Sequence, residues 1–197
     1  MAEEVLVVST RFLSDLPSGV FDVPDLLPRL LTQAQFLPRD QAEVDPSFKQ
    51  LIPYSVLRHG SEVFRYQRSA WGGERRLHGQ ASVGVGGHIN RSDVLPLWLD
   101  VTPIVDWARD REIAEEFDVA SPGQPRLVGF LNDDTTEVGL VHLGVVYEYW
   151  LDHADVHPRE KRVHIHYGFA PIAELLAHVA EYESWSQFII TQYLSRG

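Results

Sequence analysis

Cysteine is absent from this chain of 197 residues. Its absence excludes disulfide bonds, metal sites built from thiolates, and cysteine nucleophiles. Long hydrophobic runs are absent as well: the apolar stretch from Val5 to Val8 is far too short for the core of a signal peptide or for a membrane span. Because the N-terminus, Met-Ala-Glu-Glu, is acidic, we expect a cytoplasmic protein.

The chain also lacks an excess of positive charge. Its formal net charge is -11 and its pI is about 5.2. Proteins that bind polymeric nucleic acid or anionic membranes use clustered basic surface. We therefore expect neither as a partner.

The length bounds the domain organisation. A chain of this size, with 44% hydrophobic residues, can bury one core but falls short of two ordinary domains. Helical periodicity from Phe21 to Gln35 is interrupted by prolines, which indicates an accessory segment at residues 1–45 that packs on the main domain. Residues 46–197 would form that main domain.

Positive charge is concentrated in one segment. Between Leu57 and Arg91, six arginines stand against two glutamates, a local balance of +4 in a chain of -11. Guanidinium groups suit bidentate contacts with phosphate oxygens, so the segment predicts an anion site with Arg65 and Arg76 as substrate-binding candidates. The alternative is a set of solvated strand ends and turns. The six arginines are Arg58, Arg65, Arg68, Arg75, Arg76 and Arg91.

The most informative run gathers one arginine and three glutamates within a turn and a half of an expected helix: Arg111, Glu112, Glu115 and Glu116. Spacings of three and four residues bring these charges together on one helical face, while Ile113 and Phe117 form an apolar pair. Like charges at such spacings destabilise a helix by roughly 0.2 to 0.5 kcal/mol per pair. Either a bound divalent cation or solvent with Arg111 must offset the repulsion, and oxygen ligands favour a hard ion such as Mg²⁺.

This run, Arg-Glu-apolar-any-Glu-Glu, resembles the C-terminal half of the signature helix of the Nudix hydrolases. Upstream, the segment from Ser82 to Ile89, Ser-Val-Gly-Val-Gly-Gly-His-Ile, resembles the strand and double glycine that open the same signature. The extended form, in which Gly73 to Gly79 leads into Gly86 to Asn90, is similar to a bacterial branch labelled predicted phosphoesterases. The isomerase branch, which relies on a catalytic cysteine, fits this cysteine-free chain poorly.

The resemblance has two departures. Gly87 lies twenty-four residues before Arg111, about ten more than in the usual pattern, so an insertion lengthens the box. The first glutamate of the pattern has no counterpart at the strict spacing, and three aspartates compete for its role: Asp93, Asp100 and Asp106.

The resemblance implies a diphosphate hydrolase that uses Mg²⁺, with Mn²⁺ as a substitute. The implied metal ligands are Glu112, Glu115, Glu116 and the backbone carbonyl of Gly86 or Gly87. Glu115 or Glu116 would lie near the activated water, and Arg111 would hold a glutamate in position through a salt bridge. A further glutamate outside the helix completes many such sites, and Glu137, in an expected strand, is the candidate.

The substrate implied is a nucleoside diphosphate linked to another group, or a related organic pyrophosphate. Glu74, His78 and Ser82 fall in the branch-like segment and would line the pocket; equally, Glu74 and Arg76 would form a turn salt bridge. Aromatic side chains that could stack on a base are Tyr66, Trp71, Tyr147 and Trp150. A homodimer is a further expectation from the resemblance.

Periodicity predicts the order of elements. Strands are expected at 4–9, 61–66, 82–87, 126–131, 136–151 and 162–167, with the signature helix from Thr102 to Phe117 and two closing helices at 171–181 and 184–194. This is an α+β pattern, which agrees with the α/β/α sandwich with a mixed sheet that the resemblance implies.

Three alternatives remain open. The glutamates could form the solvated face of an ordinary amphipathic helix. His164 and His166, on one strand face, could join His142 and Glu148 in a site for iron or zinc. A non-catalytic module could sense a nucleotide through a Nudix-like pocket, although three repelling carboxylates would then serve no purpose.

Overall fold

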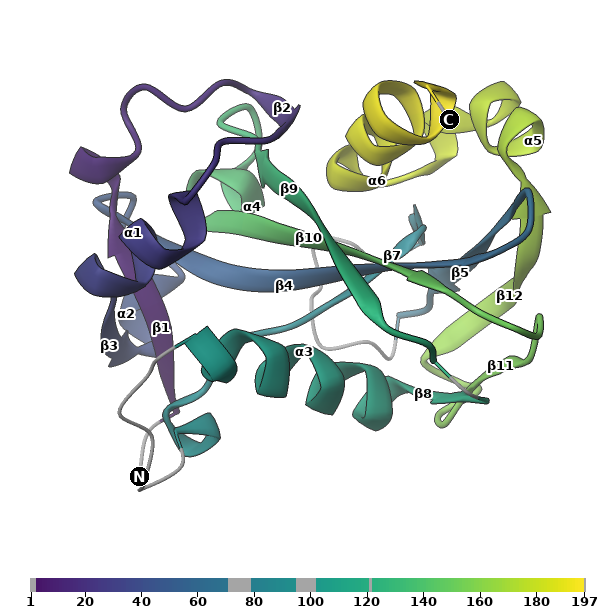
Figure 1. The fold of residues 1–197 in the computed structure, drawn as a ribbon, viewed down its shortest axis with the longest axis horizontal. Coiled ribbons are helices and arrows are strands. Elements are labelled where there is room, and N and C mark those ends of the chain that lie inside the picture. Colours follow the sequence, from purple (N-terminus) through teal and green to yellow (C-terminus); the bar gives the residue numbers. More distant parts are fainter. Residues whose placement is uncertain (1–2, 71–78, 95–101, 121, 197) are drawn as a thin grey trace. The chain divides into compact units, whose positions relative to one another are not determined.

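The computed structural model describes residues 3–70, 79–94, 102–120 and 122–196 (Figure 1). The chain forms two compact units. Unit 1 comprises Met1–Tyr54, Gly86–Arg111 and Gly129–Val146, and unit 2 comprises Ser55–Val85, Glu112–Val128 and Tyr147–Gly197. Five elements contribute residues to both units: β4 (Phe48–His59), β7 (Gly84–Gly86), α3 (Thr102–Glu116), β9 (Pro125–Asn132) and β10 (His142–Trp150).

In unit 1, short strands pair with the long strands β4 and β9. Strand β1 pairs antiparallel with β3 and with β4, and β2 pairs antiparallel with β9. Val5, Val7 and Ala42 form a fully buried cluster, against which Leu37 and Phe48 pack. Its other elements are β1 (Glu4–Ser9), β2 (Gly19–Phe21), α1 (Leu26–Gln33), β3 (Gln35–Pro38), α2 (Arg39–Ala42) and α4 (Glu137–Leu140).

In unit 2, β5 pairs antiparallel with β4, β6 and β12, and β8 pairs antiparallel with β11. Glu183 caps helix α6, because its carboxylate accepts hydrogen bonds from the backbone amides of Trp185 and Ser186. The elements are β5 (Glu62–Arg68), β6 (Ala81–Ser82), β8 (Phe117–Val119), β11 (Val156–Pro158), β12 (His164–Pro171), α5 (Ile172–Ala177) and α6 (Ser184–Phe188), followed by a short π-helix (Ile189–Tyr193).

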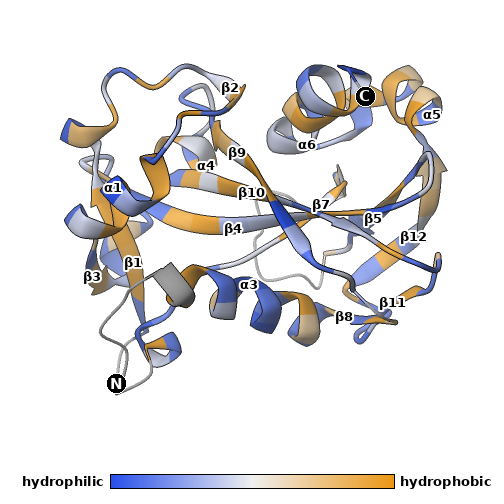
Figure 2. Cartoon of the chain, viewed as in Figure 1, coloured by the Kyte–Doolittle hydropathy of each residue, from blue (hydrophilic) through white to orange (hydrophobic). Residues whose placement is uncertain are grey.

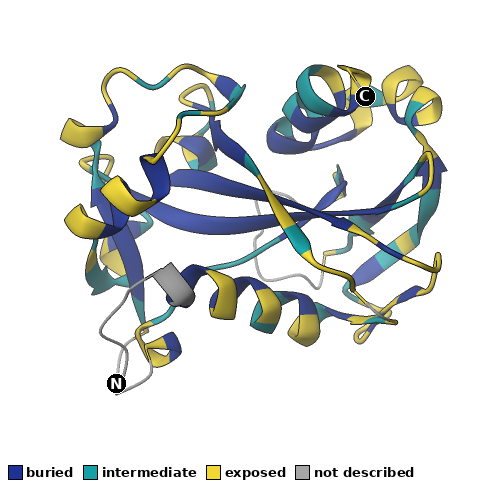
Figure 3. Ribbon diagram, in the orientation of Figure 1, coloured by how far each residue is buried: buried dark blue, intermediate teal, exposed yellow. Residues whose placement is uncertain are grey.

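The central strands explain the fold class. In β4 only Phe48 and His59 escape full burial, and in β10 only Trp150 does, as the dark ribbons of Figure 3 show. The amide of Gln50 donates to the carbonyl of Val141, and further along that of Leu151 donates to the carbonyl of Arg58, so β4 and β10 run parallel. Parallel strands buried on both faces beside antiparallel neighbours make a mixed sheet. The predicted α+β fold with a mixed sheet is confirmed.

Two local predictions were wrong. Residues 137–140 form α4 rather than part of a strand, because the hydroxyl of Thr136 accepts a hydrogen bond from the amide of Gly139 and caps a helical turn. The helix expected from Phe21 to Gln35 is shorter, because β2 takes Gly19–Phe21 and α1 begins only at Leu26. The domain boundary after residue 45 stays a prediction.

Helix α3 alternates between buried and exposed positions at the helical period. Ile104, Val105, Ala108 and Ile113 are buried, whereas Trp107 is half exposed. The hydropathy colours of Figure 2 show the same alternation of polar and apolar residues. Within the residues described, no helix is long and apolar enough to cross a membrane.

An aromatic cluster in unit 2 fixes the C-terminal end of α3. Phe117, which follows the helix directly, is 1% exposed, and its ring centroid lies 5.3 Å from that of Phe64 and 5.1 Å from that of Tyr66. The ring of His164 lies 4.8 Å from Phe117 and 4.9 Å from Tyr66. The apolar pair predicted from Ile113 and Phe117 is therefore core, and it orients the last turn of the helix.

We expect Phe117→Ala to lower the free energy of unfolding by roughly 3 to 5 kcal/mol, because it removes a buried ring and leaves a cavity. Leu127→Ala is the matched control, since Leu127 is exposed, and we expect a change within about 0.5 kcal/mol. Urea unfolding followed by tryptophan fluorescence measures both. Equal losses in the two variants would show that Phe117 does not anchor the helix.

Candidate active site

The glutamates of α3 lie in unit 2 and differ in environment. Glu115 is exposed, whereas Glu112 and Glu116 are partly buried. Glu116 immediately precedes buried Phe117, so its side chain is held beside the aromatic cluster. Its Oε2 lies 3.5 Å from Nε2 of His164.

Burial decides the protonation of this pair. It raises the pKa of Glu116 to about 7; the charges of Glu112 and Glu115 add to the rise, and only Arg68 opposes it. Burial, with Arg68 nearby, lowers the pKa of His164 to about 4, so the imidazole is neutral at pH 7. Oε2 of Glu116 is buried and has no hydrogen-bond partner among the described residues. A buried carboxylate oxygen with this environment fits a cation ligand.

In unit 1, Arg111 makes a bidentate ion pair with a buried aspartate. Its Nε and Nη2 lie 2.8 and 3.0 Å from the two carboxylate oxygens of Asp93, and Nη2 also donates to the backbone carbonyl of His88 at 2.9 Å. The amide of Asn90 donates to the same carboxylate, which completes a capping box. The salt bridge predicted from Arg111 to a glutamate stays a prediction.

Their ion-pair partners distinguish the three aspartates that were candidates for the role of the missing first glutamate. Asp93 binds Arg111, Asp106 pairs with Arg109, and Asp100 lies outside the described residues. Asp93 also stands six residues after Gly87, the spacing that the usual pattern puts between its first glycine and first glutamate. The extra residues of this box therefore fall between Asp93 and Arg111.

The double glycine passes close to β4. A Cβ atom on Gly86 would lie 3.1 Å from Cδ2 of Tyr54 and 3.2 Å from Cγ2 of Ile52, tighter than ordinary contact. A side chain at this position would push these neighbours aside by a few tenths of an ångström, so glycine suits the close approach of the backbone to the strand. A metal ligand from the carbonyl of Gly87 stays a prediction.

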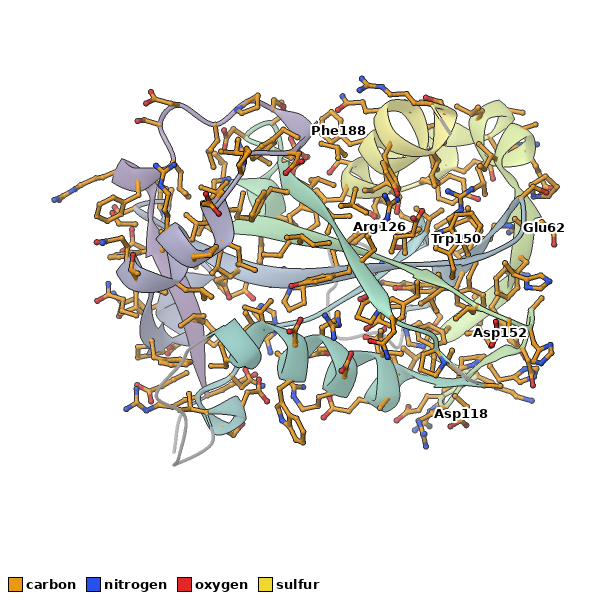
Figure 4. The ribbon with its side chains drawn as sticks, viewed as in Figure 1. Glu62, Asp118, Arg126, Trp150, Asp152 and Phe188 are labelled. Atoms are coloured by element: carbon orange, nitrogen blue, oxygen red, sulfur yellow. The ribbon has the colours of Figure 1, made fainter. Side chains whose placement is uncertain are left out.

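A second polar cluster, which sequence reasoning missed, surrounds buried Glu148 in unit 2. Its Oε1 accepts a hydrogen bond from Arg58 at 3.0 Å, and its Oε2 accepts one from Arg126 at 2.7 Å and one from the indole of Trp150 at 2.9 Å. Figure 4 labels Arg126 and Trp150, which lie close together because both donate to the same oxygen of Glu148. The signal in the sequence was a lone glutamate inside the apolar run Val-Val-Tyr-Glu-Tyr-Trp.

Two of the aromatic side chains suggested for stacking are unsuited to it. Tyr66 and Tyr147 are buried, so neither offers a ring face to a ligand. Trp150 is 49% exposed, with the guanidinium of Arg58 at 4.4 Å from its ring centroid. Trp71 lies outside the described residues.

Only two of the remaining candidates for substrate binding, Arg65 and Ser82, lie within the described residues. Arg65 makes a partly exposed ion pair with Glu174 at 3.4 Å. Ser82 is fully buried, and its hydroxyl donates to the carbonyl of Gly84 at 2.9 Å, which indicates a structural role. Glu74, Arg76 and His78 lie outside the described residues.

The prediction that His164 and His166 lie on the same face of a strand was wrong. Strand β12 bulges between Ile165 and Gly168, and His166 has a left-handed φ of 49°, so His164 is buried whereas His166 is exposed. The carboxylate of Glu148 is already bound by arginines. Glu137 lies in the first turn of α4 in unit 1 rather than in a strand, and its catalytic role stays a prediction.

Comparison with known proteins identifies the family. The chain is 35% identical to protein YmaB of Bacillus subtilis (strain 168) over 173 residues, 85% of this chain and 82% of that protein. No protein-family model matches it. The crystal structure of Tm1382, a protein assigned to the Nudix hydrolases, superposes with a TM-score of 0.80 at 29% identity and covers 99% of this chain and 100% of that one.

The NUDIX domain of NrtR from Shewanella oneidensis, solved with ADP-ribose, superposes with a TM-score of 0.50 at 17% identity over 75% of this chain and 86% of that one. At this identity it supports the fold alone. The chain belongs to the Nudix hydrolase superfamily. It is therefore a phosphohydrolase of the class that acts on acid anhydrides. Nudix hydrolases generally need a divalent metal ion.

We expect Asp93→Asn to lower the free energy of unfolding by roughly 2 to 4 kcal/mol, because it leaves the Arg111 guanidinium without its buried counter-charge. Asp118→Asn is the matched control: Asp118 and Arg159 form an exposed pair, worth roughly 0 to 1 kcal/mol. Chemical denaturation of both variants measures the difference. Similar losses would mean that the buried pair does not anchor α3.

The raised pKa of Glu116 predicts a pH-dependent stability in metal-free protein. Between its ordinary pKa of 4.5 and its folded pKa of about 7, the folded chain holds a proton that the unfolded chain releases, so the free energy of unfolding falls as pH rises. Glu116→Gln removes this dependence. Relative to wild type, we expect the variant to gain roughly 1 to 3 kcal/mol between pH 5 and pH 8 in EDTA.

Thermal unfolding across that pH range measures the effect, with exposed Glu115→Gln as the control. Parallel profiles for wild type and Glu116→Gln would contradict the raised pKa.

Proposed function

We propose that this protein hydrolyses a diphosphate linkage, with Mg²⁺ as its metal, in a nucleoside diphosphate joined to another group or in a related organic pyrophosphate. The single observation that carries the proposal is the buried, unbonded Oε2 of Glu116 among three carboxylates at the end of α3. Like charges held together in a partly buried site favour a cation that neutralises them.

Glu112 and Glu116 would hold the metal, because both are partly buried, with Glu115 completing the oxygen ligand set. When bound, Mg²⁺ would neutralise phosphoryl oxygens and lower the pKa of a water molecule. Glu115 is exposed to solvent, so its carboxylate can accept the proton of the attacking water. The neutral imidazole of His164 would stay beside Glu116 and shield Oε2 of Glu116 from water.

The cluster around Glu148 supports a nucleotide substrate. Two arginines and one glutamate leave a net charge of +1, and Arg126 is 64% exposed, so its guanidinium can contact phosphate. The half-exposed ring of Trp150 offers a surface on which a base can stack. The ADP-ribose bound by the NrtR domain is a ligand of this chemistry. A homodimer in solution is part of the same proposal.

Turnover of a substrate panel tests the proposal. The panel contains nucleoside triphosphates, dinucleoside polyphosphates, nucleotide sugars and dinucleotide cofactors, each with and without Mg²⁺. We expect one class to be hydrolysed only with Mg²⁺, and we expect Glu115→Gln and Glu116→Gln to lower kcat by roughly 10² to 10⁴-fold.

Glu181→Gln is the matched control, because Glu181 is an exposed glutamate of unit 2 and is expected to leave kcat unchanged. Circular dichroism establishes that each variant is folded. If both α3 variants kept full Mg²⁺-dependent turnover, the helix would not be the catalytic metal site. If no member of the panel were hydrolysed, the nucleotide substrate would be wrong.

A further inference from the structure

Unit 1 contains a cluster of metal-ligating side chains made by Glu43, His88 and His142. One ligand atom from each lies within 4.8 Å of the others. Nε2 of His88 is 3.8 Å from Oε1 of Glu43, and the two imidazole rings lie 5.6 Å apart at an interplanar angle of 63°. The three residues come from distant parts of the sequence: the end of α2, the loop after β7 and the start of β10.

The hydrogen bonding of His142 prepares this residue to bind a metal. Its Nδ1 lies 2.7 Å from the backbone carbonyl of Val138, an acceptor, so Nδ1 carries the proton. The lone pair is therefore on Nε2. Metal-binding histidines commonly use this arrangement, because a backbone carbonyl fixes both the tautomer and the ring orientation. The ring is buried, which further limits its rotation.

Lys49 and Arg39, two cations near the cluster, each have a carboxylate partner other than Glu43. Lys49, the buried cation near His142, pairs with Asp134 at 2.8 Å and donates to backbone carbonyls. Arg39 lies 3.5 Å from Glu43 but makes a closer pair with Glu3 at 3.0 Å. Glu43 can therefore turn toward a cation while Arg39 keeps a carboxylate partner.

We propose that Glu43, His88 and His142 bind a transition-metal ion of the Zn²⁺ type. Two imidazoles and one carboxylate match the ligand chemistry of zinc and differ from the oxygen ligands that Mg²⁺ prefers. In a tetrahedral zinc site ligand atoms lie roughly 3.3 Å apart. The present spacing, within 4.8 Å, would therefore contract by up to about 1.5 Å on binding, with water as the fourth ligand.

The site would stabilise the start of the signature. The backbone carbonyl of His88 accepts a hydrogen bond from Arg111, and Asn90, two residues on, donates to Asp93. An ion that fixes His88 therefore fixes the loop that holds Arg111. The site is separate from the proposed function, because none of its ligands comes from α3.

Isothermal titration of untagged, metal-free protein with Zn²⁺, and the visible absorption of its Co²⁺ complex, test the proposal. We expect one Zn²⁺ to bind to wild type and its affinity to fall at least about 100-fold in His88→Gln and in His142→Asn. In His142→Asn the shorter amide can still donate to Val138, which keeps the fold. His153→Gln is the matched control, an exposed histidine of unit 2.

Glu115→Gln separates this site from the α3 glutamates, and we expect Zn²⁺ to bind to that variant as it does to wild type. A Zn²⁺-induced rise in Tm that is lost in His88→Gln gives a second readout independent of activity. If His88→Gln and His142→Asn, both folded, kept wild-type affinity, or if wild type bound no Zn²⁺, the proposal would be overturned. Loss of binding in Glu115→Gln instead would assign the ion to the helix.

Discussion

The rest of the candidate site depends on the burial of Phe117 at the end of α3. The ring is surrounded by Phe64, Tyr66 and His164, so the last helical turn has one orientation, and Glu116 is carried into a poorly hydrated position beside His164. Repulsion among the three glutamates would favour fraying of an unanchored helix end. Packing of the aromatic cluster outweighs it, because one buried ring contributes several kcal/mol and each like-charge pair opposes by only a few tenths.

Arg111, which directly precedes the glutamates in sequence, anchors α3 in unit 1. Its guanidinium is fixed by Asp93, and Asp93 is fixed in turn by the amide of Asn90, so the loop after the double glycine is joined to the helix by charge-assisted bonds. The pair between Asp93 and Arg111 explains how the signature can contain an insertion. An aspartate that keeps the spacing from Gly87 can bind the arginine even though extra residues separate them in sequence, because only the two ends of the insertion need to meet.

Much of the fold was predictable from periodicity, and the signature helix was predicted almost to its last residue because its apolar face and its charged run are both regular. The errors arose where local hydrogen bonds compete with periodicity: Thr136 starts a helical turn inside an apparent strand, and the bulge of β12 separates His164 from His166. The Asp93 partner of Arg111 and the cluster around Glu148 depend on contacts between residues far apart in sequence. A single sequence gives no distance information about such pairs. It named Asp93 only as one of three candidates for the role of the missing first glutamate.

Glu116 and Glu148 show how the same residue type is prepared for opposite tasks. Burial disfavours ionisation of both. For Glu148, hydrogen bonds from Arg126, Arg58, Tyr193 and Trp150 outweigh burial and lower its pKa, so it stays charged and holds two guanidinium groups in place. For Glu116 no comparable donor is present among the described residues, and neighbouring glutamates add to the effect of burial. A carboxylate that is already neutralised organises cations of the protein, whereas one that is not must take its positive charge from solution, as either a proton or a metal ion. Under the proposed function, the environment of Glu148 would serve contact with phosphate and that of Glu116 would serve binding of metal.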